Sequence, residues 1–154
     1  MTATVEARLE ALGLTLPSAP APAANYVPFT RSGSTLYVSG QISVDASGPV
    51  TGKLGEALSV EEGAAAARLC ALALLAQVRA ACDGDFERLV RVLKLTGFVN
   101  SAPGFTDQPK VVNGASDLLV ELLGERGRHA RSAVSAASLP LGVAVEIEGI
   151  FEIR

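Results

Sequence analysis

The sequence predicts an α+β domain built on a single sheet, with its helices packed on one face. Segments with strand and helix patterns follow one another in the order β-β-α-β-α-β-β, after one short helix at the start. So few helices can cover only one face of a sheet. The last strand segment alternates, with Val145, Ile147 and Phe151 pointing one way and Glu146 and Glu148 the other. The first set can pack under the helices, and we expect other subunits to cover the second.

The composition is that of one apolar-rich domain. The chain has 154 residues, of which 49% are hydrophobic and 19% charged, which is more apolar than an average soluble domain. Extra apolar content in a small domain often serves contacts between subunits. The net charge of −3 and the scattered Lys and Arg residues argue against a nucleic-acid partner.

The first 24 residues are expected to form a helix and a linker ahead of the main domain. Apolar residues at helical spacing predict a short helix over Thr4–Leu12, ended by Gly13, and Pro17–Ala24 is an Ala/Pro linker. This segment lacks the apolar core of a signal peptide. The longest apolar run, Leu69–Ala76, is too short to span a bilayer. We therefore expect a cytoplasmic protein with no membrane partner.

Two strands and a long helix should follow. Asn25–Thr30 and Thr35–Ile42 have strand patterns on either side of a turn, and the Gly/Pro-rich stretch Asp45–Gly55 is expected to be loop. Ser59 is placed to cap a helix that should run to about Cys82. The many alanines of this helix favour close packing on a sheet.

The second half predicts a strand, a loop, a helix and two more strands. Its expected elements are a helical turn at Asp85–Leu89, a strand at Val90–Val99, a loop over Asn100–Val112, a helix over Ala115–Leu123 and strands at Ser132–Ala137 and Val143–Ile153. The last two strands are joined by a turn at Leu139–Gly142. Asn113 is placed to cap the helix of residues 114–123, which is the expected role for it.

Cysteine and histidine usage gives no sign of a metal or a cofactor. Cys70 and Cys82 lie on one predicted helix, about 18 Å apart along its axis, which is too far for a disulfide. With one histidine and no closely spaced cysteine pair, a zinc or iron site is not expected. That histidine, His129, sits in a Gly/Arg-rich turn and is expected to be solvated.

Arg131 is the most informative single residue. Its guanidinium has a rigid fork of donors that matches a carboxylate. Among so many small apolar residues, such a charge needs a partner from the protein or from a ligand. Two alternatives therefore stay open, an ion pair with Glu146 or Glu148 and a bound carboxylate.

Four short motifs, in their order and spacing, resemble the RidA/YjgF family, also called the L-PSP endoribonuclease-like family, over residues 25–154. They are Asn25-Tyr26-Val27-Pro28, Val38-Ser39-Gly40-Gln41-Ile42, Val112-Asn113, and Ala130-Arg131-Ser132 with Leu139-Pro140 and Val145-Glu146-Ile147-Glu148. The resemblance implies a chorismate-mutase-like fold, a homotrimer and ligand sites in the clefts between subunits. For the best-studied branch it implies hydrolysis of reactive enamines and imines, such as 2-aminoacrylate, to a 2-oxo acid and ammonia, without a cofactor.

The resemblance also assigns roles to individual residues. The ligand-gripping arginine falls on Arg131 and the acid/base glutamate on Glu146. Substrate-binding positions fall on Tyr26, on Asn113 and on the backbone at Ser39 and Gly40. Tyr26 could equally well only pack, and Glu146 could be only a hydrogen-bonded carboxylate at a subunit contact.

Two departures from the family pattern leave the function open. Ala133 stands where the family often has cysteine, so a thiol plays no part there, and the N-terminal segment and the Asn100–Val112 stretch are longer than in the deaminase branch. A trimer that binds small carboxylates without catalysis, as a metabolite sensor, is the alternative. The ribonuclease activity in the family's older name is a third hypothesis, disfavoured by the acidic balance and the single histidine.

Overall fold

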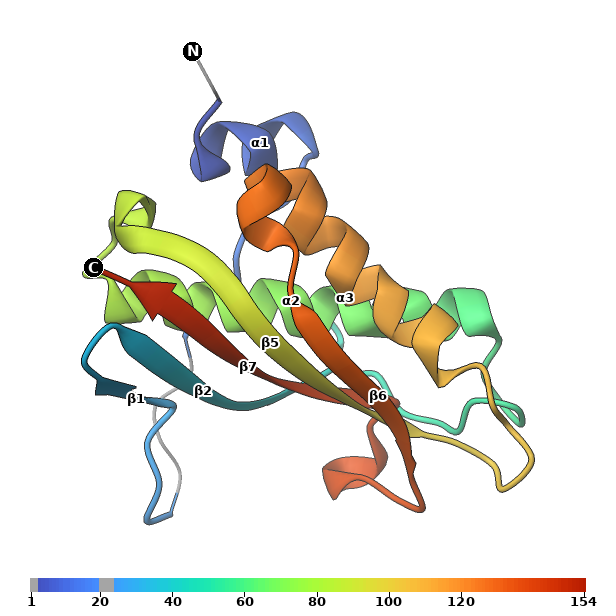
Figure 1. Ribbon diagram of the computed structural model, residues 1–154. Coiled ribbons are helices and arrows are strands. Elements are labelled where there is room, and N and C mark those ends of the chain that lie inside the picture. Colours follow the sequence, from blue (N-terminus) through green and yellow to red (C-terminus); the bar gives the residue numbers. More distant parts are fainter. Residues whose placement is uncertain (1–2, 20–23) are drawn as a thin grey trace.

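The computed structural model, which describes residues 3–19 and 24–154, has one five-stranded sheet in the predicted α+β arrangement. Figure 1 shows its strands in the spatial order β1 (Phe29–Ser32), β2 (Thr35–Ile42), β7 (Val145–Ile153), β5 (Leu89–Asn100) and β6 (Ala130–Ala136). The pair β5 and β6 is parallel, and the other neighbours are antiparallel. The last two strands in the sequence are therefore separated in space by β5.

Helices cover one face of this sheet. Figure 1 shows α2 (Val60–Ala81) running behind the strands and α3 (Gln108–Leu123) beside it. The short α1 (Val5–Ala11) lies at the C-terminal end of α3, where Arg8 Nη1 donates hydrogen bonds to the carbonyls of Glu121 and Leu122 at 3.3 and 3.2 Å. No α-helix of the described segments lies over the opposite face, which we call the open face.

The central helix α2 begins where the sequence predicts. The Ser59 hydroxyl accepts a hydrogen bond from the Glu62 N–H at 3.2 Å, and the Glu62 carboxylate accepts one from the Ser59 N–H at 2.8 Å. This capping box satisfies two backbone donors that would otherwise have no partner. By length and composition α2 could cross a membrane, but its most apolar part is 56% buried within the domain, as expected of a core helix.

Small residues bring α2 and α3 into close contact. A Cβ atom added at Gly114 of α3 would overlap the backbone of Ala64 in α2, and one added at Gly63 of α2 would lie 3.1 Å from Val111 Cγ2 in α3. The alanines of α2 therefore serve the approach of α3 as well as the packing on the sheet.

Helix α3 is longer than the sequence suggests, and its early start corrects two predictions. It begins at Gln108, so the predicted loop over Asn100–Val112 is confined to residues 101–107. Pro109 lies in the first turn, where a missing N–H costs nothing. Asn113 is consequently inside the helix, and its expected role as the helix cap is wrong.

Polar contacts hold the loop of residues 101–107 in place. Lys53 Nζ donates to Asn100 Oδ1 at 2.7 Å and also to the carbonyl of Ala137, and Gln108 Nε2 donates to the Phe105 carbonyl at 2.8 Å. The Ser101 N–H also donates to the Ala136 carbonyl at 3.4 Å, so the loop is attached both to the end of β6 and to the start of α3.

Other strand boundaries shift by a few residues. The first strand begins at Phe29 instead of Asn25, because Pro28 has no N–H for a strand ladder. The predicted loop Asp45–Gly55 overlaps a small hairpin of β3 (Val44–Asp45) and β4 (Gly48–Pro49). Three 3₁₀ turns complete the structure, η1 (Phe86–Arg88), η2 (Gly124–Gly127) and η3 (Pro140–Gly142).

The N-terminal segment and the sheet share one core. Val5, Leu9 and Leu16 are buried in the same apolar cluster as the residues under α2 and α3. Cys70 and Cys82 are free and buried, with no disulfide between them. Residues 20–23 of the predicted linker lie outside the described residues.

Gly114→Ala should lower the free energy of unfolding by roughly 1–3 kcal/mol, because the new methyl group overpacks the α2–α3 contact. Chemical denaturation measures the change. Gly104→Ala is the matched control, since an added Cβ there meets no atom within 4 Å. Equal stability of the two variants would contradict this account of the helix contact.

Candidate functional site

Arg131 lies on the helix-covered face of β6. It pairs in register with Leu95 of β5, which is fully buried under the helices. Its guanidinium reaches α3, where Nη1 donates to Asn113 Oδ1 at 2.8 Å and to Ser116 Oγ at 3.1 Å. Nη2 donates a longer bond, 3.4 Å, to the carbonyl of Pro109. The first turns of α3 therefore hold this side chain.

No carboxylate among residues 3–19 and 24–154 forms an ion pair with Arg131. The ion pair with Glu146 or Glu148 that the sequence leaves open therefore does not form within one chain. In β7 the residues Val145 and Ile147 are buried toward the helices, so Glu146 and Glu148 project from the open face. Arg131 keeps its full charge and is supported only by neutral acceptors.

A hollow of about 250 Å³ opens beside Arg131, between α3 and the edge of β6. It is lined by Ser116, Asp117, Val120, Arg128, His129 and Arg131. Two guanidinium groups and the carboxylate of Asp117 belong to this lining, so its net charge is positive. Arg128 is partly compensated by Glu125, whose carboxylate lies 3.0 Å from its Nε atom.

His129 is part of the wall of this hollow, and the expectation that it is solvated is wrong. Its Nδ1 lies 2.6 Å from the Gly127 carbonyl and its Nε2 lies 2.9 Å from Ser116 Oγ. Burial lowers the pKa of His129, and the neighbouring charge of Arg131 lowers it to a smaller degree. The hydrogen bond to the Gly127 carbonyl raises the pKa, but the net effect is a lower value. The imidazole is therefore held neutral near pH 7.

Glu146 lies on the open face beneath a bulge in β2. The register between β2 and β7 shifts between Val38 and Gln41, so Ser39 and Gly40 form the bulge. A Cβ added at Gly40 would lie 3.0 Å from the Glu146 carboxyl carbon, so glycine leaves room above that carboxylate. Burial, and then the charge of Glu148, raise the pKa of Glu146.

Ser39 holds the segment that carries Tyr26. Its N–H donates to the Pro28 carbonyl at 2.9 Å and its hydroxyl to the Val27 carbonyl at 2.8 Å. Its carbonyl accepts a hydrogen bond from Gln41 Nε2 at 2.9 Å. Tyr26, which is 57% exposed, projects from this segment into solvent in the single chain.

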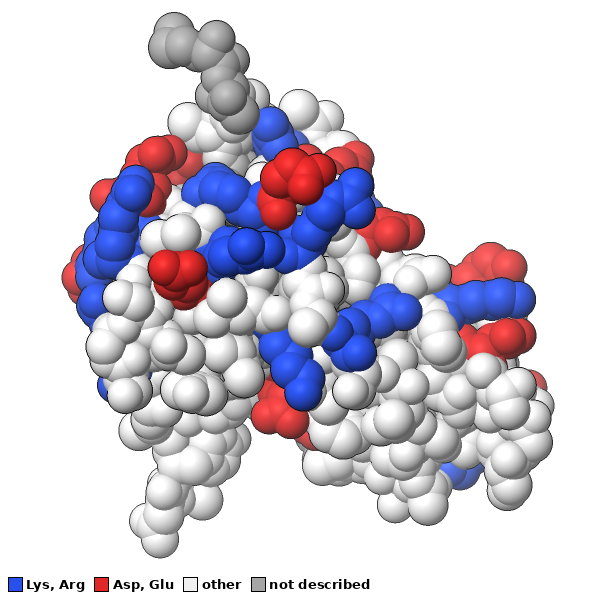
Figure 2. All heavy atoms as spheres, in the orientation of Figure 1, with Lys and Arg blue, Asp and Glu red and all other residues white. Residues whose placement is uncertain are grey.

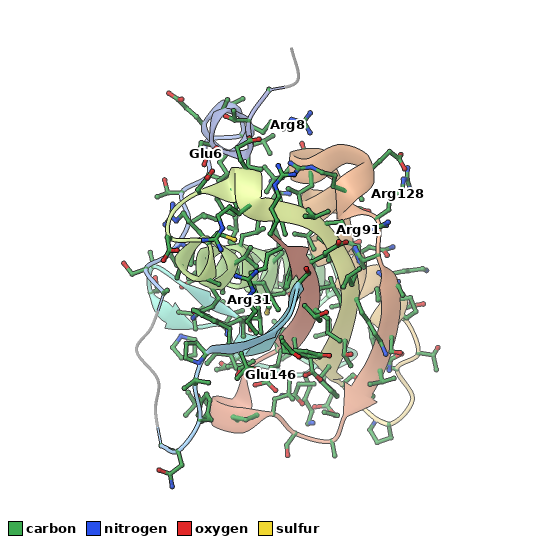
Figure 3. All side chains as sticks on the ribbon, turned by 60° about the vertical axis from the view of Figure 1, so that its left-hand side comes forward. Glu6, Arg8, Arg31, Arg91, Arg128 and Glu146 are labelled. Carbon is green, nitrogen blue, oxygen red and sulfur yellow. The ribbon has the colours of Figure 1, made fainter. Side chains whose placement is uncertain are left out.

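The predicted site residues thus form two groups on opposite faces of the sheet. Arg131 and Asn113 meet on the helix side, while Glu146 and Gly40 meet on the open face. In Figure 3, Glu146 and the hollow residue Arg128 lie well apart. The structure therefore does not bring Arg131 and Glu146 together within one chain.

The sequence reasoning missed Ser116 as a partner of Arg131. Asn113 and Ser116 are three residues apart, which places them on the same side of a helix. That signal was hidden because the helix was expected to begin only at Ala115. In the described part of the chain, no three His, Cys, Asp or Glu side chains are grouped so that they could hold a metal ion.

Glu146→Gln should stabilise the protein near pH 7, and the advantage should shrink as the pH falls toward the ordinary glutamate pKa of 4.5. The folded carboxyl binds its proton more tightly than the unfolded one, so the wild type loses stability as the pH rises through the raised pKa. The amide carries no such penalty. Thermal unfolding across this pH range measures the difference.

The control for this variant is Glu152→Gln, on the same face of the same strand. An equal response of the two variants to pH would show that burial of Glu146 is not the cause.

Comparison with known proteins places the chain in a family. It matches the family described as YjgF/chorismate mutase-like, putative endoribonuclease, over residues 6–150. Protein TCP17 of Trypanosoma cruzi is 53% identical over 152 residues, which cover 97% of this chain and 94% of that protein.

Two solved structures are similar over nearly their whole length. Atu1372 of Agrobacterium tumefaciens, a protein of unknown function, is 52% identical with a TM-score of 0.91 and coverage of 97% of this chain and 92% of that one. A Shewanella oneidensis protein, described as a putative endoribonuclease, is 38% identical with a TM-score of 0.92 and coverage of 98% and 100%. The chain therefore belongs to the RidA/YjgF family and has its chorismate-mutase-like α+β fold.

Proposed function

We propose that the protein is a hydrolytic deaminase of small reactive enamines and imines such as 2-aminoacrylate, acting as a homotrimer. One observation carries the proposal. Arg131 is oriented by α3 but has no carboxylate partner among the residues described. A guanidinium group that is held in place and has no ion-pair partner is suited to bind a substrate carboxylate.

The carboxylate would occupy the part of the guanidinium that the protein leaves open. Both hydrogens of Arg131 Nη1 are directed to Asn113 and Ser116, and one hydrogen of Nη2 to Pro109. The Nε–H and the second Nη2 hydrogen lie on one edge of the planar group, so they can bind both oxygens of a carboxylate. This grip would fix the C=N bond of the substrate relative to the rest of the site.

Glu146 would supply the acid/base step. Its raised pKa makes it a better proton acceptor than an ordinary glutamate carboxylate, so it can take a proton from water and later return it. An enamine such as 2-aminoacrylate first becomes the imine by moving a proton from its nitrogen to its terminal carbon. Water then adds to the imine carbon, and Glu146 takes a proton from the water and returns it to the nitrogen. Glu146 next takes the hydroxyl proton of the adduct and passes it to the nitrogen as the C–N bond breaks, so that the C=O bond forms and ammonia leaves. The products are a 2-oxo acid and ammonia, and no cofactor takes part.

A second copy of the chain is needed to complete this site. Arg131 and Glu146 lie on opposite faces of one sheet, so a small substrate can meet both only if they come from neighbouring protomers. The open face carries exposed apolar side chains, including Tyr37 at 48% and Val134 at 44% exposure, which association would cover. Three protomers in a ring would form three such clefts, with Tyr26 and the Ser39–Gly40 bulge as further walls.

A more distant relative supports the class of ligand. TdcF of E. coli, 26% identical with a TM-score of 0.58 and coverage of 88% of this chain and 93% of that one, has a structure with bound serine. Serine carries the α-carboxylate that Arg131 would recognise, next to a nitrogen in the position of the enamine nitrogen. We place the activity in the cytoplasm, where such intermediates of amino-acid metabolism form.

The alternative is a trimer that binds small carboxylates and does not turn them over. Ala133, which lies on the same side of β6 as Arg131, offers no thiol to the site, and binding alone would need only the arginine side of the cleft. Ribonuclease activity is a weaker candidate. Figure 2 shows the Lys and Arg side chains interspersed with carboxylates in the upper half of the visible face, instead of the continuous basic surface that RNA requires.

Arg131→Ala should reduce the deaminase activity about 100-fold or more, because the substrate carboxylate loses its charged partner. A serine dehydratase that releases 2-aminoacrylate supplies the substrate, and the rate of pyruvate formation is the readout. Arg68→Ala is the control, since Arg68 lies on α2, away from the lining of the hollow, and forms a half-exposed ion pair with Glu121.

Acceleration by the wild type that persists in Arg131→Ala would contradict the assigned role. If the wild type gives no acceleration but binds pyruvate in calorimetry, the sensor alternative is correct.

Mixing two inactive variants tests whether the site is shared between chains. Arg131→Ala and Glu146→Gln, unfolded together and refolded at equal amounts, should recover about a quarter of the wild-type activity, because one cleft in four joins two intact residues. Each variant refolded alone should stay inactive. If mixing restores nothing although sedimentation shows mixed trimers, both residues act within one chain or the mechanism is wrong.

A further inference from the structure

Ser116 and His129 lie against Arg131 but have no part in the reaction proposed above. Ser116 Oγ is 3.1 Å from Arg131 Nη1 and 2.9 Å from His129 Nε2. His129 Nδ1 is in turn 2.6 Å from the Gly127 carbonyl. Three elements, α3, η2 and β6, therefore meet through one chain of polar contacts.

The direction of each hydrogen bond in this chain is determined by its ends. The Gly127 carbonyl can only accept, so Nδ1 carries the imidazole hydrogen, and the neutral ring leaves Nε2 as an acceptor. The Ser116 hydroxyl then donates to Nε2. Its oxygen lone pairs are left for the Arg131 guanidinium, which can only donate.

This arrangement decides which edge of the guanidinium is available. Ser116 and Asn113, on the same side of α3, together engage both hydrogens of Arg131 Nη1. Without Ser116 in this orientation, the guanidinium could rotate about its flexible stem. A ligand would then have to restrict that motion on binding, at a cost in affinity.

We propose that Ser116 and His129 are positioning residues that hold Arg131 with its Nε–Nη2 edge toward the ligand carboxylate. The inference rests on the proposed function, because it takes Arg131 as the carboxylate-binding residue. His129 acts through Ser116, and neither residue touches the reacting atoms.

Two replacements of nearly equal shape at Ser116 test the role of its hydroxyl. Ser116→Val should weaken the binding of pyruvate, measured by calorimetry at neutral pH, about tenfold, whereas Ser116→Thr should stay within about twofold of the wild type. Threonine keeps the hydroxyl and valine replaces it by a methyl group. Equal losses in both variants would show that only the size of serine matters and would overturn the proposal.

The matching pair at His129 tests the imidazole. His129→Gln can still present an oxygen acceptor to Ser116, but His129→Leu cannot, so only the leucine variant should bind pyruvate less tightly. The double variant Ser116→Val/His129→Leu should bind no more weakly than Ser116→Val alone, because both changes interrupt one chain of hydrogen bonds. Additive losses of pyruvate affinity would show that the two residues do not act through one chain of hydrogen bonds.

The Arg131→Ala variant separates failure of this inference from failure of the proposed function. If pyruvate binds to the wild type and is lost in Arg131→Ala, but Ser116→Val binds normally, only the positioning role is wrong. Should the wild type not bind pyruvate at all, the carboxylate-binding function fails and this inference fails with it.

Discussion

The alternation of side chains across the β-sheet is the constraint on which the functional organisation depends. Successive residues of a strand point to opposite faces, so Arg131 reaches α3 from β6 while Glu146 projects from the uncovered side of β7. No rotamer change moves either group through the sheet. Any reaction that uses both residues must therefore be assembled from more than one chain.

The packing of the two long helices serves the arginine side of this arrangement. Gly63 and Gly114 allow close contact between α2 and α3, and this contact places the N-terminal half of α3 over the edge of the sheet. Asn113 and Ser116 then meet Arg131 within hydrogen-bonding distance. The close packing that Gly63 and Gly114 allow in the core thus helps to determine how the Arg131 guanidinium is oriented.

The two candidate groups have complementary electrostatic properties. Arg131 is a permanent charge surrounded by neutral acceptors, so its positive potential is left for a ligand. Glu146 is partly buried beside Glu148, and both features raise the pKa of its carboxyl group above the ordinary glutamate value. In the proposed reaction, the carboxylate-binding charge and the proton-transfer group would come from different strands, β6 and β7, and from opposite faces of the sheet.

The sequence alone determined the fold class, the capped central helix and the alternating last strand, and it marked Arg131 as a charge in need of a partner, because these follow from local periodicity and side-chain chemistry. It did not reveal where α3 begins, since Pro109 and Gly114 have a loop-like pattern whose helical conformation depends on packing against α2. The contacts of Arg131 with Ser116 and His129 and its separation from Glu146 were likewise decided only by the tertiary structure. The contacts depend on where α3 packs against β6, and the separation depends on which face of the sheet each side chain takes. Strand order adds to the separation, because β5 lies between the two strands that are neighbours in the sequence.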